Sequence, residues 1–173
     1  MGLVIDRVLS GIIDHLHDRH DREFRINAVQ PLRQIACKYY APAVKAITAR
    51  LEDSDWMVRQ AALLALAEIV AQPDVQVVTA VADCLKNDPQ VDVRQAATFA
   101  LSRTVEKGDL VAFTALKDRS LVDESVYVRR DAAEAAAFIV DENNAEAVRW
   151  IRERLKYLNK TVDDAWNFCH RGE

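Results

Sequence analysis

Apolar residues recur at spacings of three and four along most of the chain, and polar residues fill the positions between them. This spacing gives a helix one apolar face, whereas the strict alternation of a half-buried strand is missing. Short turns rich in Asp, Asn, Gly and Pro separate the periodic segments. The pattern predicts an all-α chain, with helices over residues 2–17, a segment ending near 40, and then 42–51, 55–71, 74–86, 90–106, 109–118, 124–141, 145–158 and about 161–170.

One stretch of this pattern returns at a fixed interval. Val-Arg pairs recur every 35 residues, at Val58-Arg59, Val93-Arg94 and Val128-Arg129. An aspartate stands five residues before each pair, and alanines follow it. A divergent copy contains Phe24-Arg25, and a degenerate last copy contains Val162. A period of this length is typical of solenoids, in which each helix pair buries its apolar face against the next pair.

The repeated residues resemble the HEAT repeat. The first of the three full copies carries the motif as Leu51, Asp53, Val58, Arg59, Ala61, Ala62, Ala65 and Leu66. The resemblance implies a right-handed α-α superhelix of about five antiparallel helix pairs, whose second helices line a concave face. The pairs are expected within a single domain, 1–173, at about 2–40, 41–71, 73–106, 109–141 and 145–171. Because terminal repeats are often atypical, the degenerate ends suggest a whole array rather than a piece of one.

The aspartates and arginines of the motif allow a catalytic or a structural interpretation. A catalytic site needs one constellation, whereas these residues recur in every central copy, so we favour structure. In HEAT proteins such side chains form a ladder of hydrogen bonds and ion pairs between adjacent repeats, and the arginine fork suits bidentate contact with a carboxylate. The expected ladder residues are Asp53, Arg59, Asp88, Arg94, Asp123 and Arg129.

The second helices also carry large side chains opposite the expected core positions. Leu64, Phe99 and Phe138 stand where a solubilised repeat would carry Glu or Lys. Side by side, they would form an apolar stripe with charges around it, which is typical of a binding site. A rotation of the assumed helix face by one position would instead place them in the core. The expected groove residues are Leu64, Phe99, Arg103, Tyr127, Arg130, Glu134 and Phe138.

HEAT proteins mostly act as protein-binding scaffolds, so we predict a non-enzymatic adaptor that binds a helix or extended peptide of another protein. One alternative is a nucleic-acid binder, similar to HEAT-like DNA glycosylases. It would use a basic patch on the helix 145–160, formed by Arg149, Arg152, Arg154 and Lys156. The net charge of −4 argues against a generic nucleic-acid binder. Another alternative is a protein similar to the HEAT-like bilin lyases, which hold a tetrapyrrole.

The sequence offers little catalytic chemistry. No phosphate-binding glycine motif or nucleophile elbow occurs, and we expect no catalytic residue, cofactor or metal. His15, His17 and His20 form a polar turn rather than a ligand set. Cys37, Cys84 and Cys169 lie far apart, which indicates reduced thiols in an intracellular, cytoplasmic protein, with the nucleus as the other compartment. No signal peptide or membrane span is evident, and the oligomeric state stays open.

Overall fold

The computed structural model describes residues 23, 26–27, 41–70 and 74–169, and side chains are described as far as Asn159. All regular elements of these residues are helices, which confirms the all-α prediction. They are α3 (Ala41–Thr48), the 3-10 helix η1 (Ala49–Glu52), α4 (Trp56–Ile69), α5 (Val75–Asn87), α6 (Val91–Thr104), α7 (Leu110–Val122), α8 (Val126–Ile139) and α9 (Ala145–Cys169).

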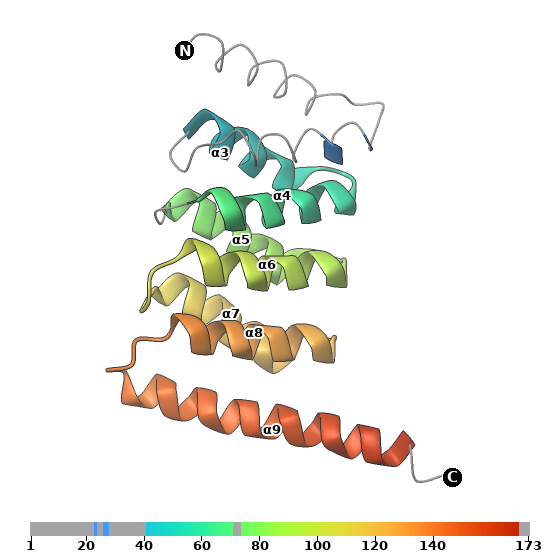
Figure 1. Cartoon of the computed structure of the whole chain (residues 1–173), viewed down its shortest axis with the longest axis vertical. Coiled ribbons are helices and arrows are strands. Elements are labelled where there is room, and N and C mark those ends of the chain that lie inside the picture. Colours follow the sequence, from blue (N-terminus) through green and yellow to red (C-terminus); the bar gives the residue numbers. More distant parts are fainter. Residues whose placement is uncertain (1–22, 24–25, 28–40, 71–73, 170–173) are drawn as a thin grey trace.

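The helices form two layers (Figure 1). The second helices of successive pairs, α4, α6 and α8, lie side by side, with α4 packed on α6 and α6 on α8. The first helices form the layer behind them, where α5 packs on α7. Within the pairs, α3 packs on α4, α5 on α6 and α7 on α8, and α9 follows α8. This stacking of antiparallel pairs confirms the HEAT-like solenoid.

Polar residues before the helices fix where they begin. Asp55 accepts a hydrogen bond from the Met57 N–H at 2.9 Å, and Asp74 accepts one from Gln76 at 2.8 Å. The side chain of Asp109 caps α7 in the same way. Each such cap stabilises a helix by about 1 kcal/mol, because it satisfies an N–H that has no partner inside the helix. The turn before α4 is therefore an N-cap turn.

Small side chains allow the second helices to pack closely. Ala62, Ala97 and Ala132 occupy equivalent positions of α4, α6 and α8, and all three are fully buried. Larger aliphatic residues of both layers, such as Leu66 of α4 and Leu116 of α7, belong to the same continuous core. Since no pair covers its own apolar face, each depends on its neighbours for burial.

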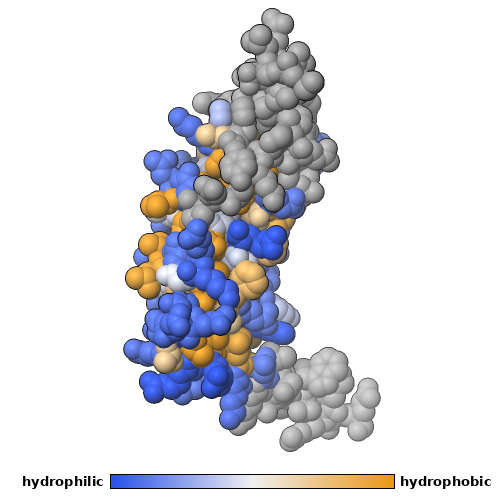
Figure 2. Space-filling model, turned by 60° about the vertical axis from the view of Figure 1, so that its left-hand side comes forward, coloured by the Kyte–Doolittle hydropathy of each residue, from blue (hydrophilic) through white to orange (hydrophobic). Residues whose placement is uncertain are grey.

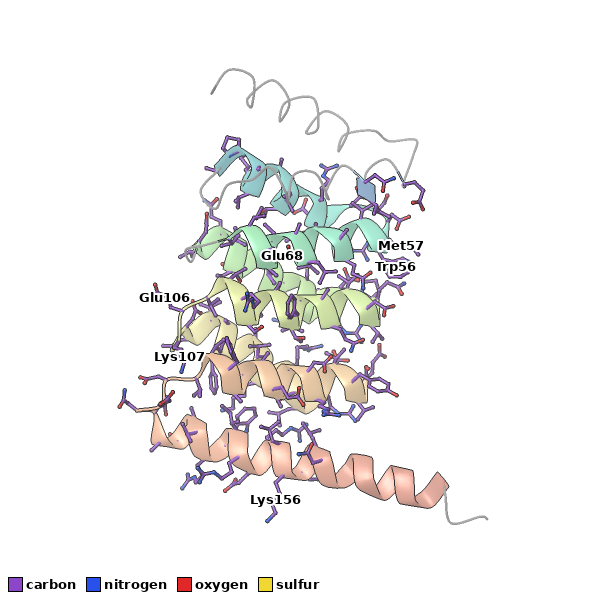
Figure 3. The ribbon with its side chains drawn as sticks, viewed as in Figure 1. Trp56, Met57, Glu68, Glu106, Lys107 and Lys156 are labelled. Atoms are coloured by element: carbon purple, nitrogen blue, oxygen red, sulfur yellow. The ribbon has the colours of Figure 1, made fainter. Side chains whose placement is uncertain are left out.

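Gly108 lies in the loop between α6 and α7. Its φ of +87° falls in the left-handed region, which favours glycine. Its N–H donates to the Ile139 carbonyl oxygen at 2.7 Å and so satisfies a group at the end of α8. The neighbouring Lys107, seen in this loop in Figure 3, forms an exposed ion pair with Glu142 at 2.8 Å. The loop thus links the third and fourth pairs.

Two predicted helix ends are wrong. The helix predicted over 109–118 continues to Val122, because residues 119–122 contain no helix breaker and Ser120 donates to the Lys117 carbonyl within the helix. The break predicted near residues 159–160 is absent, and α9 runs unbroken from Ala145 to Cys169. No Gly or Pro lies inside that range, so nothing stops the helix. Residues 145–169 therefore form one helix rather than a helix pair.

The remaining predicted ends agree with the structure to within a few residues. Apart from residues 23, 26 and 27, the first predicted pair, residues 2–40, lies outside the described residues, as do the three histidines of the polar turn and Cys37. Within the part of the chain that is described, no helix combines the length and the apolar character needed to cross a bilayer.

Candidate binding face of the second helices

Two arginines join successive helix pairs through buried carboxylates. Arg59 donates from Nε and Nη2 to the two oxygens of Asp88, at 2.6 and 2.9 Å. Arg94 repeats this fork with Asp123, at 2.9 and 3.0 Å. The hydrogen bonds to these carboxylates raise the pKa of both arginines, although burial acts in the opposite direction. Both arginines therefore stay charged and hold neighbouring pairs together.

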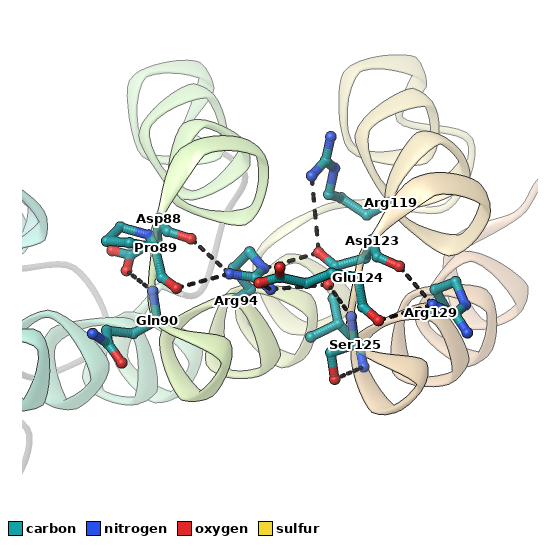
Figure 4. A network of polar contacts seen from close by, with 10 residues as sticks. Asp88, Pro89, Gln90, Arg94, Arg119, Asp123, Glu124, Ser125 and Arg129 are labelled. Atoms are coloured by element: carbon teal, nitrogen blue, oxygen red, sulfur yellow. Dashed lines mark hydrogen bonds and ion pairs between the residues drawn. The ribbon is translucent and has the colours of Figure 1, made fainter.

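A third nitrogen anchors each arginine to the turn before its own helix. Nη1 donates to the carbonyl oxygen of the motif aspartate, at 2.8 Å in Arg59, 2.8 Å in Arg94 and 2.6 Å in Arg129. Asp88 and Asp123 each accept a further bond from an N–H two residues along the chain. Figure 4 shows the resulting line of contacts from Asp88 to Arg129. The structure thus brings the expected ladder residues together along one edge of the solenoid.

Two members of this network were not predicted from the sequence. Glu124 accepts a bond from Arg94 Nη2 at 3.0 Å, and Arg119 Nη1 lies 3.8 Å from Asp123 (Figure 4). Arg119 and Asp123 are four residues apart at a helix end, a spacing at which side chains meet. The contact of Arg119 with Asp123 could therefore have been predicted from the spacing. The contact of Glu124 with Arg94 could not, because it depends on how two helix pairs stack.

The expected groove residues lie on the exposed side of α4, α6 and α8. The exposed fraction is 38% for Leu64, 48% for Phe99 and 62% for Phe138. Tyr127, at the start of α8, is 68% exposed. By contrast, Leu63 directly beside Leu64 is fully buried. The three large apolar side chains are therefore outside the core. The alternative, in which the helix face is rotated by one position and these residues are buried, is wrong.

Their alignment differs from the expected stripe. Leu64 and Phe99 are both the ninth residue of helices with 14 residues, and Glu134 has that place in α8. Phe138 lies four residues further along, at the position of Glu68 in α4 and Arg103 in α6. Four residues correspond to about 6 Å along a helix. The expectation of three side chains in direct register is therefore wrong: Leu64 and Phe99 are in register, and Phe138 is displaced towards the C-terminal end of α8.

Charged and polar groups surround these apolar side chains. Arg130 Nε donates to Glu134 at 2.8 Å, one turn along α8, and both side chains are about half exposed. Arg103 and Glu68 are exposed on α6 and α4, and Figure 3 shows Glu68 on the front of its helix. Between the helices, Gln95 donates to Asp131 at 2.7 Å. The face therefore combines apolar anchors with charges of both signs.

Apolar residues also reach the surface elsewhere. Val75, Leu110 and Val111 are exposed where α5 and α7 begin. Figure 1 shows the starts of these two helices on its left-hand side, which Figure 2 turns forward. These residues belong to the first helices, away from the binding face proposed below. They provide matched positions for control substitutions.

The basic residues of α9 do not form one patch. Arg149, Arg152 and Lys156 are exposed at spacings of three and four, on one side of the helix. Arg154 is half-buried and donates from Nη2 to the Ser120 carbonyl oxygen of α7. Trp150 packs against Phe113 of α7, edge to face, with ring centres 6.1 Å apart. Trp150 therefore serves helix packing rather than an open stacking surface.

Cys84 is the free cysteine among the described side chains. Burial is the main cause that raises the pKa of its thiol to about 11. It lines a cleft beside η1 and the end of α5, together with Glu52, Asp83 and Arg59. A thiol with this pKa is almost entirely protonated near neutral pH, which makes it a poor nucleophile.

The comparisons with known proteins agree with this architecture. The family profile of HEAT repeats matches residues 9–102. No curated protein matches the sequence. Among solved structures, a crystal structure of an engineered protein from the Northeast Structural Genomics Consortium is 22% identical, with a TM-score of 0.55, and the match covers 83% of this chain and 67% of that one. At this identity the likeness concerns the fold. Since the profile covers more than half of the chain, the protein belongs to the HEAT-repeat family.

Proposed function

We propose that the exposed face of α4, α6 and α8 binds a helix or extended segment of another protein. The observation that carries the proposal is the exposure of Leu64, Phe99 and Phe138 on helices whose other faces are buried. Large apolar side chains that do not support the core and are surrounded by charges are typical of interaction sites. HEAT repeats commonly serve as protein-interaction scaffolds, which is consistent with this role.

The central anchor in this proposal is Phe99, because α6 lies between the other two second helices. A partner segment would cover Phe99 together with Leu64 on one side and Phe138 on the other. Aromatic side chains commonly contribute most of the binding energy of an interface, because they bury a large rigid surface. Arg103 and Arg130 would pair with acidic groups of the partner, and Tyr127 would contact its edge. Glu134 competes for Arg130 in the free protein, since the two form an ion pair.

The proposed role is non-enzymatic. The ladder arginines and aspartates are used for packing, and the Cys84 thiol has a raised pKa rather than the lowered one of a nucleophile. We also propose a cytoplasmic location, because Cys37, Cys84 and Cys169 are odd in number and far apart in the sequence, as is typical of reduced thiols. The partner then belongs to the same compartment.

A pair of matched variants tests this proposal. The tagged protein would be used to capture partners, with Phe99→Ala/Phe138→Ala compared against Leu110→Ala/Val111→Ala. The first pair should lose the captured protein, and the second pair should retain it, because Leu110 and Val111 are exposed on α7. Both variants should keep the helical circular dichroism of the wild type. Retention of the partner by the Phe99→Ala/Phe138→Ala variant would reject the proposal, whereas loss of helicity would mean that the side chains support the fold.

A second candidate function is nucleic-acid binding through Arg149, Arg152 and Lys156, which are exposed on one side of α9. Such binding should weaken steeply with salt, because it depends on release of counterions from phosphates. A gel shift with duplex DNA at low salt tests it, and Arg149→Gln/Arg152→Gln should abolish the shift. Absence of a shift for the wild type would exclude this candidate. A tetrapyrrole-binding role has no support among the described residues beyond the shared repeat.

A further inference from the structure

The arginine–aspartate pairing between successive helix pairs, each instance of which is one rung of the ladder, is not repeated where α8 meets α9. In the two preceding rungs, Nε and Nη2 of Arg59 and Arg94 hold the carboxylate of an aspartate 29 residues further along the chain. Arg129 is anchored like them, through Nη1 to the carbonyl oxygens of Asp123 and Glu124. The residue 29 positions after Arg129 is Leu158, which is buried in α9. Among the described residues, no carboxylate pairs with Arg129.

A second arginine converges on the same place. In the previous rung Arg119, in the last turn of α7, points to Asp123 with Nη1 at 3.8 Å. Arg154 stands 35 residues after Arg119 and is its counterpart in α9. Arg154 donates to the carbonyl oxygen of Ser120, close to the Asp123 carbonyl that holds Arg129. The two arginines that face Asp123 in the previous rung therefore both have counterparts here, Arg129 and Arg154. The position equivalent to Asp123 is occupied by Leu158.

This arrangement leaves hydrogen-bond donors unused. The Nε of Arg154 is buried and lacks a hydrogen-bond partner in the described part of the chain, as does the Nε of its counterpart Arg119. What differs is that Arg119 faces the carboxylate of Asp123, whereas Arg154 has no described carboxylate beside it. Arg154 and Arg129 donate to carbonyl oxygens only three residues apart, those of Ser120 and Asp123. Burial is the main cause that lowers the pKa of Arg154, and the positive charge of Arg129 lowers it as well. The carbonyl oxygens at the end of α7 offset only part of this charge, since a helix end carries about half a negative charge. An anion would relieve the repulsion and satisfy the free donors.

We propose that Arg129 and Arg154 form a carboxylate-binding site for an aspartate-bearing turn of an acidic peptide segment. The preceding rungs identify the ligand, because Asp88 and Asp123 show which group a guanidinium with this anchoring accepts. In both, the carboxylate belongs to a turn and also accepts an N–H two residues along. The docked segment would thus extend the ladder by one rung. The site is separate from the exposed face of α4, α6 and α8 and does not depend on its function.

NMR of the arginine Nε–H groups tests the site directly. The ¹⁵N-labelled full chain would be titrated with the capped tripeptide Asp-Ala-Ser, its counterpart Asn-Ala-Ser, and inorganic phosphate, at constant ionic strength. The Asp peptide should shift the Arg129 and Arg154 signals saturably, the Asn peptide should not, and phosphate should bind more weakly. The Arg94 signal should stay in place, because Asp123 and Glu124 already occupy that side chain.

Two variants locate the effect. Arg154→Leu should weaken binding of the Asp peptide about tenfold, the loss of one charge-assisted hydrogen bond. Arg152→Gln, an exposed arginine on the same helix, should leave the affinity unchanged. The proposal fails if no probe shifts the two signals of the wild type, if phosphate shifts them and the Asp peptide does not, or if a folded Arg154→Leu binds like the wild type. The second outcome would point to a phosphate-bearing partner such as a nucleic acid. The titration of the wild type decides the question even if Arg154→Leu does not fold.

Discussion

Two adjacent leucines of α4 should respond very differently to truncation. Leu63 is fully buried, whereas Leu64 is 38% exposed. Leu63→Ala removes a side chain from the core and leaves a cavity, which should lower the free energy of unfolding by about 3 kcal/mol. Leu64→Ala removes a side chain that water already reaches, and should cost about 1 kcal/mol or less. The residue type and the helix are the same, so the two changes differ mainly in burial.

Thermal unfolding followed by circular dichroism measures this difference. In a chain of this size, 1 kcal/mol corresponds to about 2–4 °C, so Leu63→Ala should lower the Tm by about 6–12 °C. The Tm of Leu64→Ala should fall by no more than about 4 °C. Equal losses, or a larger loss for Leu64→Ala, would show that Leu64 belongs to the core. The exposed face, and with it the proposed function, would then be refuted.

Three further changes test the ladder, the buried thiol and the loop glycine. Arg94→Met should destabilise the protein by about 3 kcal/mol in urea, because it leaves the carboxylate of Asp123 buried without its main partner. Arg130→Met, which breaks an exposed pair, should leave the urea midpoint unchanged. The pKa of Cys84 is raised from 9.0 to about 11, so its thiolate is rarer in the folded state. Mass-spectrometric alkylation at pH 8 should be about a hundredfold slower for Cys84 in the folded than in the unfolded chain. The same shift should make stability fall between pH 9.0 and about 11, and fall less in Cys84→Ala. Gly108→Ala should lower the free energy of unfolding by about 1–2 kcal/mol, because φ at this position is +87°. A steric clash adds nothing, since the nearest atom to a new Cβ is at an ordinary contact distance of 3.5 Å. An unchanged urea midpoint for Arg94→Met or Gly108→Ala, or equal alkylation rates for Cys84, would contradict the corresponding prediction.

The repeat made much of the fold predictable. A 35-residue interval places Arg59, Arg94 and Arg129 at equivalent points, and a regular stack then brings each close to the turn of the next pair. The same periodicity separates core from surface, as the adjacent residues Leu63 and Leu64 show. These features follow from local spacing because each helix pair contacts mainly its neighbours.

Other features depend on information that local spacing lacks. In α9 the repeat pattern is weak and does not indicate where the helix ends. A turn is therefore predicted from the sequence in a segment that contains no helix breaker and is one helix in the structure. The interval also indicated that Phe138 is the counterpart of Arg103 rather than of Phe99, but similarity of side chains suggested a straight stripe. Arg154 was grouped with its basic neighbours, although its side chain turns towards α7. Charge composition does not show which side of a helix a cation faces.

Photocrosslinking from position 99 tests most directly whether the second helices bind a partner. Phe99 would be replaced by p-benzoylphenylalanine in the full chain inside cells, and Leu110 would be replaced in the same way as the control. Both positions are exposed, but Phe99 lies on α6 and Leu110 begins α7. Irradiation should give a distinct crosslinked protein from position 99 that is absent from position 110 and is lost with Phe138→Ala. The same products from both positions, or none from position 99, would contradict the proposed binding face.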